Sequence, residues 1–172
     1  PILEGFYPDP SICRVGNDYY LVNSSFAYFP GLPIFHSTDL VSWKQIGNAM
    51  DRNTQLKIDN APVSGGLFAP TIRYNKGTFY IMCTNVSGAG NFIITTKNPK
   101  GPWSDPILTP AVNGIDPSLF FDDNGKVYIT YNSDPPDNKS LYNCHRICRL
   151  IEYDIATQKT VGDNKIIVNG GT

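Results

Sequence analysis

An internal repeat built on a short proline-containing motif constrains this chain most. Asp-Pro-Ser begins at Asp9 and again at Asp116, and Ala-Pro-Thr at Ala69 is a third copy without the carboxylate. Each copy precedes a short apolar run, a polar turn and an aromatic-rich alternating run. The tyrosines of these alternating runs follow their motifs by 11, 11 and 12 residues, at Tyr20, Tyr80 and Tyr128. Three copies at nearly one spacing predict a repeated supersecondary unit.

Each repeat predicts four short strands, because β-branched and aromatic runs alternate with turns rich in glycine and proline. The expected strands are 11–15, 18–24, 33–37 and 43–47, then 70–74, 78–84, 91–96 and 103–108, then 117–121, 126–132, 147–153 and 159–168. Trp43 and Trp103 are 60 residues apart, like Asp9 and Ala69, which supports the repeat. No segment keeps a helical period over three turns, although residues 53–62 have room for one helical turn.

Four antiparallel strands per repeat are the signature of β-propeller blades, so we expect an all-β fold. The expected blades cover roughly residues 5–50, 65–110 and 114–168. A propeller places the first strand of every blade around a central channel, so the strand starts converge at one end. Asp9 and Asp116 are therefore predicted to face one solvent-reachable pocket, with Ala69 leaving room between them.

The backbone around Asp9 is predicted to be extended, because a following proline disfavours the helical region for the residue before it. A simpler interpretation is that the Asp residues only form turns or cap strands. The copy at Ala69 argues against capping. If the strand start needed an Asp cap, the middle repeat would also have an Asp at this position.

Two carboxylates in one pocket suit glycoside hydrolysis, in which one activates water while another group keeps a proton for the leaving oxygen. Aromatic side chains that can stack on sugar rings lie in loops and strand starts at the same end of the repeats. The candidates are Phe26, Tyr28, Phe29 and Phe68. The alternative for each of them is ordinary core packing.

Four motifs resemble glycoside hydrolase family 43, most of all its β-xylosidase and α-L-arabinofuranosidase branch. They are FYPDPS, SFAYFPG, GGLFAP and GIDPSLF, which occur in the family's order and span nearly the whole chain. The resemblance implies a five-bladed β-propeller, of which this chain supplies about three blades, and an inverting mechanism. It also implies roles for individual residues. Asp9 matches the general base, Asp116 matches the carboxylate that tunes the general acid, and the residues that match the sugar subsite are Phe26, Phe68, Ala69 and Ile115.

The general acid of this family is a Glu in a Glu-Gly-Pro motif that opens the fourth blade. This chain contains only Glu4 and Glu152, and neither is followed by Gly-Pro. We therefore expect the acid beyond Thr172 and interpret residues 1–172 as the N-terminal part of a larger catalytic domain. The remaining blades are expected in the same chain or in another chain, with a homo-oligomer as a further way to cover open blade faces.

Composition excludes several other functions. The net charge is −1, and the 14 basic residues do not cluster, so no nucleic-acid partner is expected. No apolar run is long enough for a membrane span. Cys144 and Cys148 flank the sequence His-Arg-Ile, but no second pair stands at zinc-site spacing, so neither a metal nor a cofactor is expected. The lack of a disulfide framework favours a cytoplasmic location.

The leading hypothesis is an exo-acting glycosidase in xylan degradation, which cuts β-1,4-xylosides such as xylo-oligosaccharides and has α-L-arabinofuranosides as a second substrate class. A non-catalytic carbohydrate-binding propeller is the alternative, and a purely structural propeller is a third interpretation. The retained Asp residues and loop aromatics argue against the third. A Glu-Gly-Pro motif at the start of the next blade would distinguish the first two.

Overall fold

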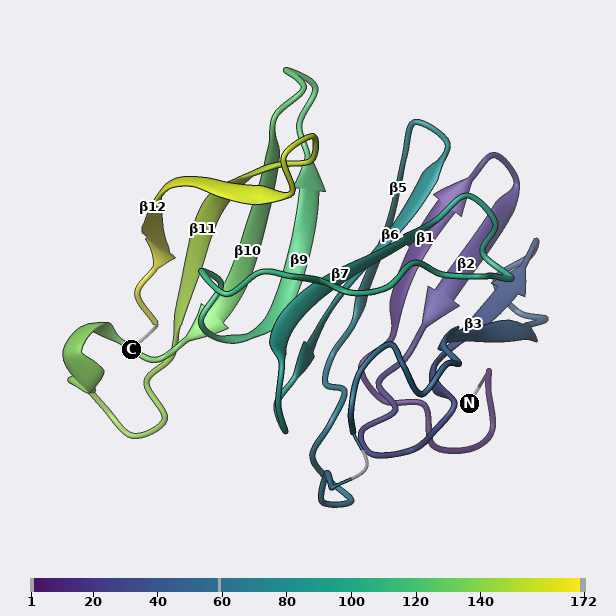
Figure 1. Ribbon diagram of the computed structural model, residues 1–172, viewed down its shortest axis with the longest axis horizontal. Helices are drawn as coiled ribbons and strands as arrows, with labels where there is room; N and C mark the ends of the chain where they lie inside the picture. Colours follow the sequence, from purple (N-terminus) through teal and green to yellow (C-terminus); the bar gives the residue numbers. More distant parts are fainter. Residues whose placement is uncertain (1, 59, 171–172) are drawn as a thin grey trace.

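The computed structural model describes residues 2–58 and 60–170 and contains three four-stranded antiparallel sheets that lie side by side (Figure 1). Blade 1 comprises β1 (Ser11–Val15), β2 (Asp18–Val22), β3 (Gly31–Ser37) and β4 (Lys44–Met50). Blade 2 comprises β5 (Thr71–Asn75), β6 (Thr78–Asn85), β7 (Gly90–Thr96) and β8 (Ile107–Leu108). Blade 3 comprises β9 (Ile115–Phe121), β10 (Val127–Ser133), β11 (Ile147–Asp154) and β12 (Lys159–Val168). Neighbouring strands in each sheet follow each other in sequence, which confirms the all-β class and the three predicted blades.

The outer strand predicted at 103–108 is the clearest difference from expectation, because only its last two residues form β8. Side chains from the segment after blade 1 take up the backbone carbonyl groups of its first half. Arg52 donates to the Trp103 carbonyl at 3.0 Å, and Gln55 donates to the Ser104 carbonyl at 3.1 Å. These bonds link blade 2 to the inter-blade segment, while the Ser104 backbone N–H still donates to the Thr95 carbonyl of β7 at 2.8 Å.

The single helical turn considered for residues 53–62 is not formed, since the described residues of that segment, which leave out residue 59, adopt turns or irregular backbone. The two matched tryptophans also differ in packing. Trp103 is buried in the core, whereas Trp43 is half-buried and donates its indole N–H to the Leu40 carbonyl at 3.1 Å. Equal spacing in the repeat therefore does not imply equal burial.

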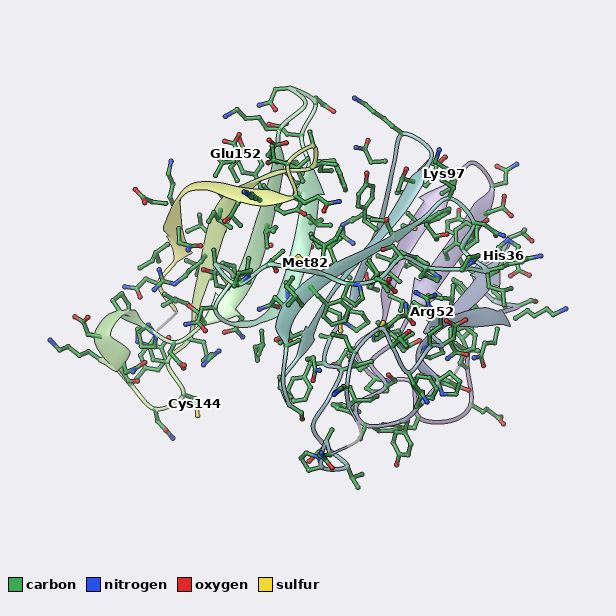
Figure 2. The ribbon with its side chains drawn as sticks, viewed as in Figure 1. His36, Arg52, Met82, Lys97, Cys144 and Glu152 are labelled. Atoms are coloured by element: carbon green, nitrogen blue, oxygen red, sulfur yellow. The ribbon has the colours of Figure 1, made fainter. Side chains whose placement is uncertain are left out.

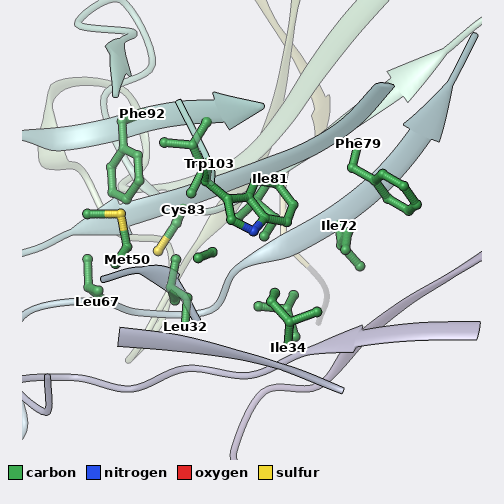
Figure 3. Close-up of a cluster of buried hydrophobic side chains, with 13 residues drawn as sticks. Leu32, Ile34, Met50, Leu67, Ile72, Phe79, Ile81, Cys83, Phe92 and Trp103 are labelled. Carbon is green, nitrogen blue, oxygen red and sulfur yellow. The ribbon is translucent and has the colours of Figure 1, made fainter. Parts of the chain in front are cut away.

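Two apolar clusters join the three blades, one at each interface. Figure 3 shows the first cluster, between blades 1 and 2, which includes Leu32, Ile34, Met50, Ile81, Phe92 and Trp103. The second cluster, between blades 2 and 3, includes Met82, Ile93, Leu119, Ile129 and Ile151. Each blade thus buries one face on the next, as propeller blades do, and this packing fixes how the strand starts lie relative to each other.

The hydroxyl group of the repeated motif ties the inner strands β1, β5 and β9 together. Ser11 Oγ accepts a hydrogen bond from the Ile72 backbone N–H at 3.1 Å. Thr71 Oγ1 donates to the Pro117 carbonyl at 2.9 Å. The starts of the three inner strands therefore lie next to each other at one end of the molecule, the lower end in Figure 1.

A half-buried arginine of β5, Arg73, reinforces this contact. Arg73 donates to Ser118 Oγ at 2.8 Å and to the Leu119 carbonyl at 3.1 Å. Partial burial lowers the pKa of the Arg73 guanidinium, and burial raises the pKa of the nearby Cys13 thiol to about 12, with Arg73 opposing that rise. Arg73 is therefore a structural link between blades 2 and 3.

A long loop connects β10 to β11 at the same end of blade 3 as the start of β9. It contains a short 3₁₀ turn, η1 (Pro136–Asn138), where exposed turn chemistry was expected. Within the described residues, no helix is both long and apolar enough to cross a membrane.

Candidate active site

Asp9 lies on the exposed segment before β1 and is held by the end of β2. Its Oδ2 accepts a hydrogen bond from Ser24 Oγ at 2.6 Å. The Asn23 side chain donates to the carbonyl groups of Tyr7 at 2.9 Å and Pro8 at 3.2 Å, and the Ser24 backbone N–H also donates to Pro8 at 3.1 Å. Because Asn23 and Ser24 are buried, Asp9 is presented to solvent from a fixed backbone.

The prediction of an extended backbone at Asp9 is wrong, because its φ is +51°, in the left-handed region. Asp116 repeats this conformation with φ +53°, while Ala69 is not among the described residues with positive φ. The prediction weighed the clash with the next proline alone and missed the hydrogen bonds that hold the segment. Asp tolerates the left-handed region better than most residues. Local strain at two carboxylates, and not at the alanine between them, is typical of functional positions.

Asp116 lies near the start of β9, where β9 comes unusually close to β10. A Cβ atom on Gly114 would lie 2.2 Å from the Asn132 carbonyl oxygen, so only glycine permits this approach. The register of the two strands shifts between Thr130 and Asn132, and Asn132 pairs with Ile115. This local irregularity brings the Asn132 side chain within hydrogen-bond reach of the Asp116 carboxylate.

The electrostatic environment of Asp116 raises the pKa of its carboxyl group. Partial burial is the largest cause, and the negative charge of Asp9 adds to it. The positive charge of Arg146 and the hydrogen bond with Asn132 act in the opposite direction. Asp9 and Asp116 are 107 residues apart in sequence, yet they interact electrostatically at the same end of the inner strands. The acid and base carboxyl groups of inverting glycosidases lie roughly 6.5–9.5 Å apart, and a broadly similar distance between the carboxylates of Asp9 and Asp116 is a prediction.

Phe26 and Phe68 lie next to each other beside this end. Their ring centroids are 5.6 Å apart in an edge-to-face arrangement, and Phe6 adds a third ring 5.8 Å from Phe26. Phe26 and Leu67 exchange two backbone hydrogen bonds of 3.0 Å, which attach the loop of blade 1 to the start of blade 2. A Cβ on Gly66 would lie 2.4 Å from the Phe26 carbonyl oxygen, so glycine permits this contact.

The remaining candidates complete a surface that is partly apolar. Ala69 and Ile115 are half-buried, while Tyr28 and Phe29 are 59% and 47% exposed and therefore do not belong to the core. Beneath them, the Cys83 thiol donates to the Phe68 carbonyl at 3.1 Å. Burial raises the pKa of the Cys83 thiol, and the nearby charge of Asp116 contributes to this rise.

Glu152 is not placed to act as the general acid. Its carboxylate forms an ion pair with Lys126 at 2.8 Å. Lys126 directly follows the turn between β9 and β10, so Glu152 lies at the opposite end of blade 3 from Asp116, which is near the start of β9. Figure 2 shows Glu152 far from Cys144, which lies on the loop at the end of blade 3 where β9 starts. Glu4 is exposed on the segment that precedes the first motif.

Three or more metal-ligating side chains gather nowhere among residues 2–58 and 60–170. Cys144 and Cys148 are exposed free thiols, and the buried His145 accepts a hydrogen bond from the Leu141 backbone N–H at 3.2 Å. The segment considered for a metal instead carries Arg146, whose Nε donates to Asn132 Oδ1 at 2.8 Å.

Sequence reasoning missed the polar residues that hold the two carboxylates: Asn23, Ser24, Asn132 and Arg146. Asn23 and Ser24 follow the apolar run of β2, a position that signals a strand end only. Arg146 belongs to a long loop without a counterpart in the other repeats, so the repeat itself contained no signal for it.

Fold and site together define a propeller-type chain with two interacting carboxylates and adjacent aromatic rings where its inner strands begin. All of it, residues 1–172, matches the model of glycosyl hydrolases family 43. The chain belongs to glycoside hydrolase family 43.

Xylosidases and arabinosidases are among the named relatives to which this chain is similar. A "Xylosidase/arabinosidase" of Butyrivibrio fibrisolvens is 52% identical over 172 residues, which cover 99% of this chain and 33% of that protein. The non-reducing end α-L-arabinofuranosidase BoGH43B of Bacteroides ovatus is 52% identical over 147 residues, covering 83% of this chain and 26% of that protein.

Solved structures agree with the fold. The crystal structure of a GH43_12 protein retrieved from a capybara gut metagenome has 54% identity and a TM-score of 0.93, and the match covers 100% of this chain and 33% of that one. The xylan β-1,4-xylosidase of Bacillus halodurans C-125 has 42% identity and a TM-score of 0.89 over 99% of this chain and 34% of that one. The present chain spans about a third of the length of these relatives.

Proposed function

We propose that the complete protein is an inverting, exo-acting glycosidase for β-1,4-xylosides such as xylo-oligosaccharides, with α-L-arabinofuranosides as a second substrate class. One observation carries the proposal: Asp9 and Asp116 share a left-handed backbone and interact electrostatically, while Ala69 between them has neither feature. Family membership and the names of the relatives support the same chemistry.

Asp9 is the proposed general base. It is exposed at the end of the molecule where the inner strands start, and one of its carboxylate oxygens accepts a hydrogen bond from the hydroxyl of the buried Ser24. That bond orients the carboxylate and leaves the other oxygen for an attacking water. In an inverting mechanism this water adds to the sugar on the face opposite the leaving group, so no covalent intermediate forms.

Asp116 is the proposed carboxylate that tunes the general acid and orients the sugar. A negative charge close to the acid raises the pKa of the acid, which keeps its proton available for the leaving oxygen. Asp116 acts this way only when it is itself ionised, and Arg146 and Asn132 favour that form. The proposed sugar subsite is completed by Phe26, Phe68, Ala69 and Ile115.

The general acid is proposed to come from sequence outside this chain, because Glu152 is ion-paired at the far end of blade 3 and Glu4 precedes the first motif. The remaining blades would bring it to the open side of the carboxylate pair.

The test compares the complete gene product with residues 1–172 on 4-nitrophenyl β-D-xyloside and 4-nitrophenyl α-L-arabinofuranoside. We expect turnover by the complete protein and none at a useful rate by the fragment, because acid catalysis typically contributes about 10² to 10⁴-fold. Sugar binding by the complete protein without turnover on any xyloside or arabinofuranoside would instead support the carbohydrate-binding alternative.

A further inference from the structure

Arg146 carries the positive charge that acts on Asp116, one of the two carboxylates. Its side chain is 38% exposed and comes from the residue directly before β11. Nε donates to Asn132 Oδ1 at 2.8 Å, and one terminal nitrogen of the guanidinium pairs with the Asp134 carboxylate. The rigid guanidinium fork therefore holds two partners at once, one on each side.

The contact with Arg146 determines which way the Asn132 amide faces. An Asn side chain has one accepting oxygen and one donating nitrogen, and these exchange places when the amide turns over. Because Arg146 occupies the oxygen, the nitrogen remains available to donate to the carboxylate of Asp116, which directly follows Ile115, the residue that pairs with Asn132 across the two strands. A reversed amide would present its oxygen to the carboxylate, which is repulsive.

We propose that Arg146 is a positioning residue: it locks the Asn132 amide so that this amide holds the Asp116 carboxylate in place for the reaction. The inference rests on the proposed function, since it assigns a role within that same site. Arg146, Asn132 and Asp116 then form a single relay. Arg146 is hydrogen-bonded to Asn132, and its positive charge acts on the carboxylate of Asp116.

The charges that face Asp116 determine the expected pH dependence. Asp9, from the segment before β1, disfavours the ionised form of Asp116, and Arg146 and Asn132 favour it. Cys83 of β6 also faces Asp116, but burial raises its pKa and keeps the thiol neutral. Asp134 is 66% exposed and lies beyond Arg146, which it partly neutralises.

Removal of Arg146 should therefore raise the pKa of Asp116 further and reduce its ionised fraction at mildly acidic pH. In the full-length protein, we expect Arg146→Met to move the acidic limb of kcat/KM upward by about one pH unit, the lower end of the effect of an opposite charge. Arg146→Lys keeps the charge but lacks the fork, so its limb should stay near that of the wild type while kcat/KM falls about fivefold, as expected for one lost hydrogen bond.

Arg149→Met is the matched control. Arg149 lies on the same strand, and its Nε donates to Ser133 Oγ at 2.9 Å, next to Asn132 but outside the relay. We expect Arg149→Met to change neither the limb nor kcat/KM. Asn132→Ala completes the set, and the double variant of Asn132→Ala and Arg146→Met should be no worse than the poorer single variant, because residues of one relay are not additive.

An unmoved acidic limb in Arg146→Met, or additive losses in the double variant, would overturn the relay. If Arg146→Met does not fold by circular dichroism, Arg146→Lys decides, and wild-type kcat/KM in that variant would overturn the relay. Wild-type turnover and its loss in Asp9→Asn are measured in the same series. If the wild type is inactive, the proposed function fails, whereas an active wild type with unaltered Arg146 variants refutes the relay alone.

Discussion

The starts of β5 and β9 carry the same motif and differ in one side chain and its backbone. Both have a proline followed by a hydroxyl residue, and the hydroxyl group links the inner strands in both blades. At β9, Asp116 precedes the proline with a φ of +53° and a raised pKa, whereas β5 has Ala69 at that position. The hydroxyl group thus contributes to blade packing in both blades, and we infer that the carboxylate of Asp116 serves the site.

The largest effect should come from removing Asp9, the carboxylate at the equivalent position of blade 1 and the proposed general base. Asp9→Asn in the complete protein should lower kcat by about 10² to 10⁴-fold, because an amide cannot accept a proton from water. The side-chain shape is kept, so circular dichroism should not change. Asp123→Asn, at an exposed turn at the other end of blade 3, makes the same charge change and should retain full activity. Near-normal turnover by Asp9→Asn would show that the base lies elsewhere.

Gly114→Ala tests the close approach that presents Asp116. The new Cβ would meet the Asn132 carbonyl at 2.2 Å, so β9 must move away from β10. We expect a loss of about 1–3 kcal/mol in unfolding free energy, measured by denaturant titration of the complete protein. Gly88→Ala is the control, because its Cβ would make only an ordinary contact at 3.6 Å. Equal stability of the two variants would contradict the close approach.

Ala69→Asp removes the difference between the blades by giving the middle blade a carboxylate. A third negative charge should raise the pKa of Asp116 further, so the acidic limb of kcat/KM should move to higher pH. The side chain also fills space beside the sugar, and we expect kcat/KM to fall about tenfold or more at mildly acidic pH. Ala69→Asn separates the two causes, since it adds the same volume without the charge. If Ala69→Asn moved the acidic limb of kcat/KM by as much as Ala69→Asp, the charge of the new carboxylate could not be the cause of the shift.

The smallest effect concerns the hydroxyl groups that the blades share. Ser11→Ala removes the acceptor of the Ile72 backbone N–H, and Thr71→Val removes the donor to the Pro117 carbonyl. Each should cost about 1 kcal/mol of unfolding free energy, the usual net value of one hydrogen bond. Thermal melting of the complete protein measures this, and kcat should stay unchanged. A large loss of kcat without a loss of stability would mean that the hydroxyl groups belong to the site.

The same comparison explains what the sequence could predict. Strand positions and the convergence of Asp9 and Asp116 follow from a repeat, because equivalent positions in propeller blades occupy equivalent places around the axis. The sequence predicted only that Phe26 and Phe68 lie at the same end of the repeats. The structure shows that their rings pack edge to face, next to the two backbone hydrogen bonds between Phe26 and Leu67.

Features that depend on partners distant in the sequence were not predictable. The left-handed backbone at Asp9 depends on partners that lie 15 residues away, and local rules about proline favour another conformation. The segment before β8 is bonded by Arg52 and Gln55, which come from the connection between blades 1 and 2. Arg146 reaches Asp116 through a loop found in blade 3 alone among the three blades.

The anomeric form of the first product tests the central claim most directly. Time-resolved ¹H NMR of the complete protein acting on a β-xyloside should show α-xylose first, because water activated by Asp9 attacks the face opposite the leaving group. Mutarotation to the β-anomer should follow more slowly. If β-xylose appears first, the reaction passes through a covalent intermediate, and the assignment of Asp9 as a general base is contradicted.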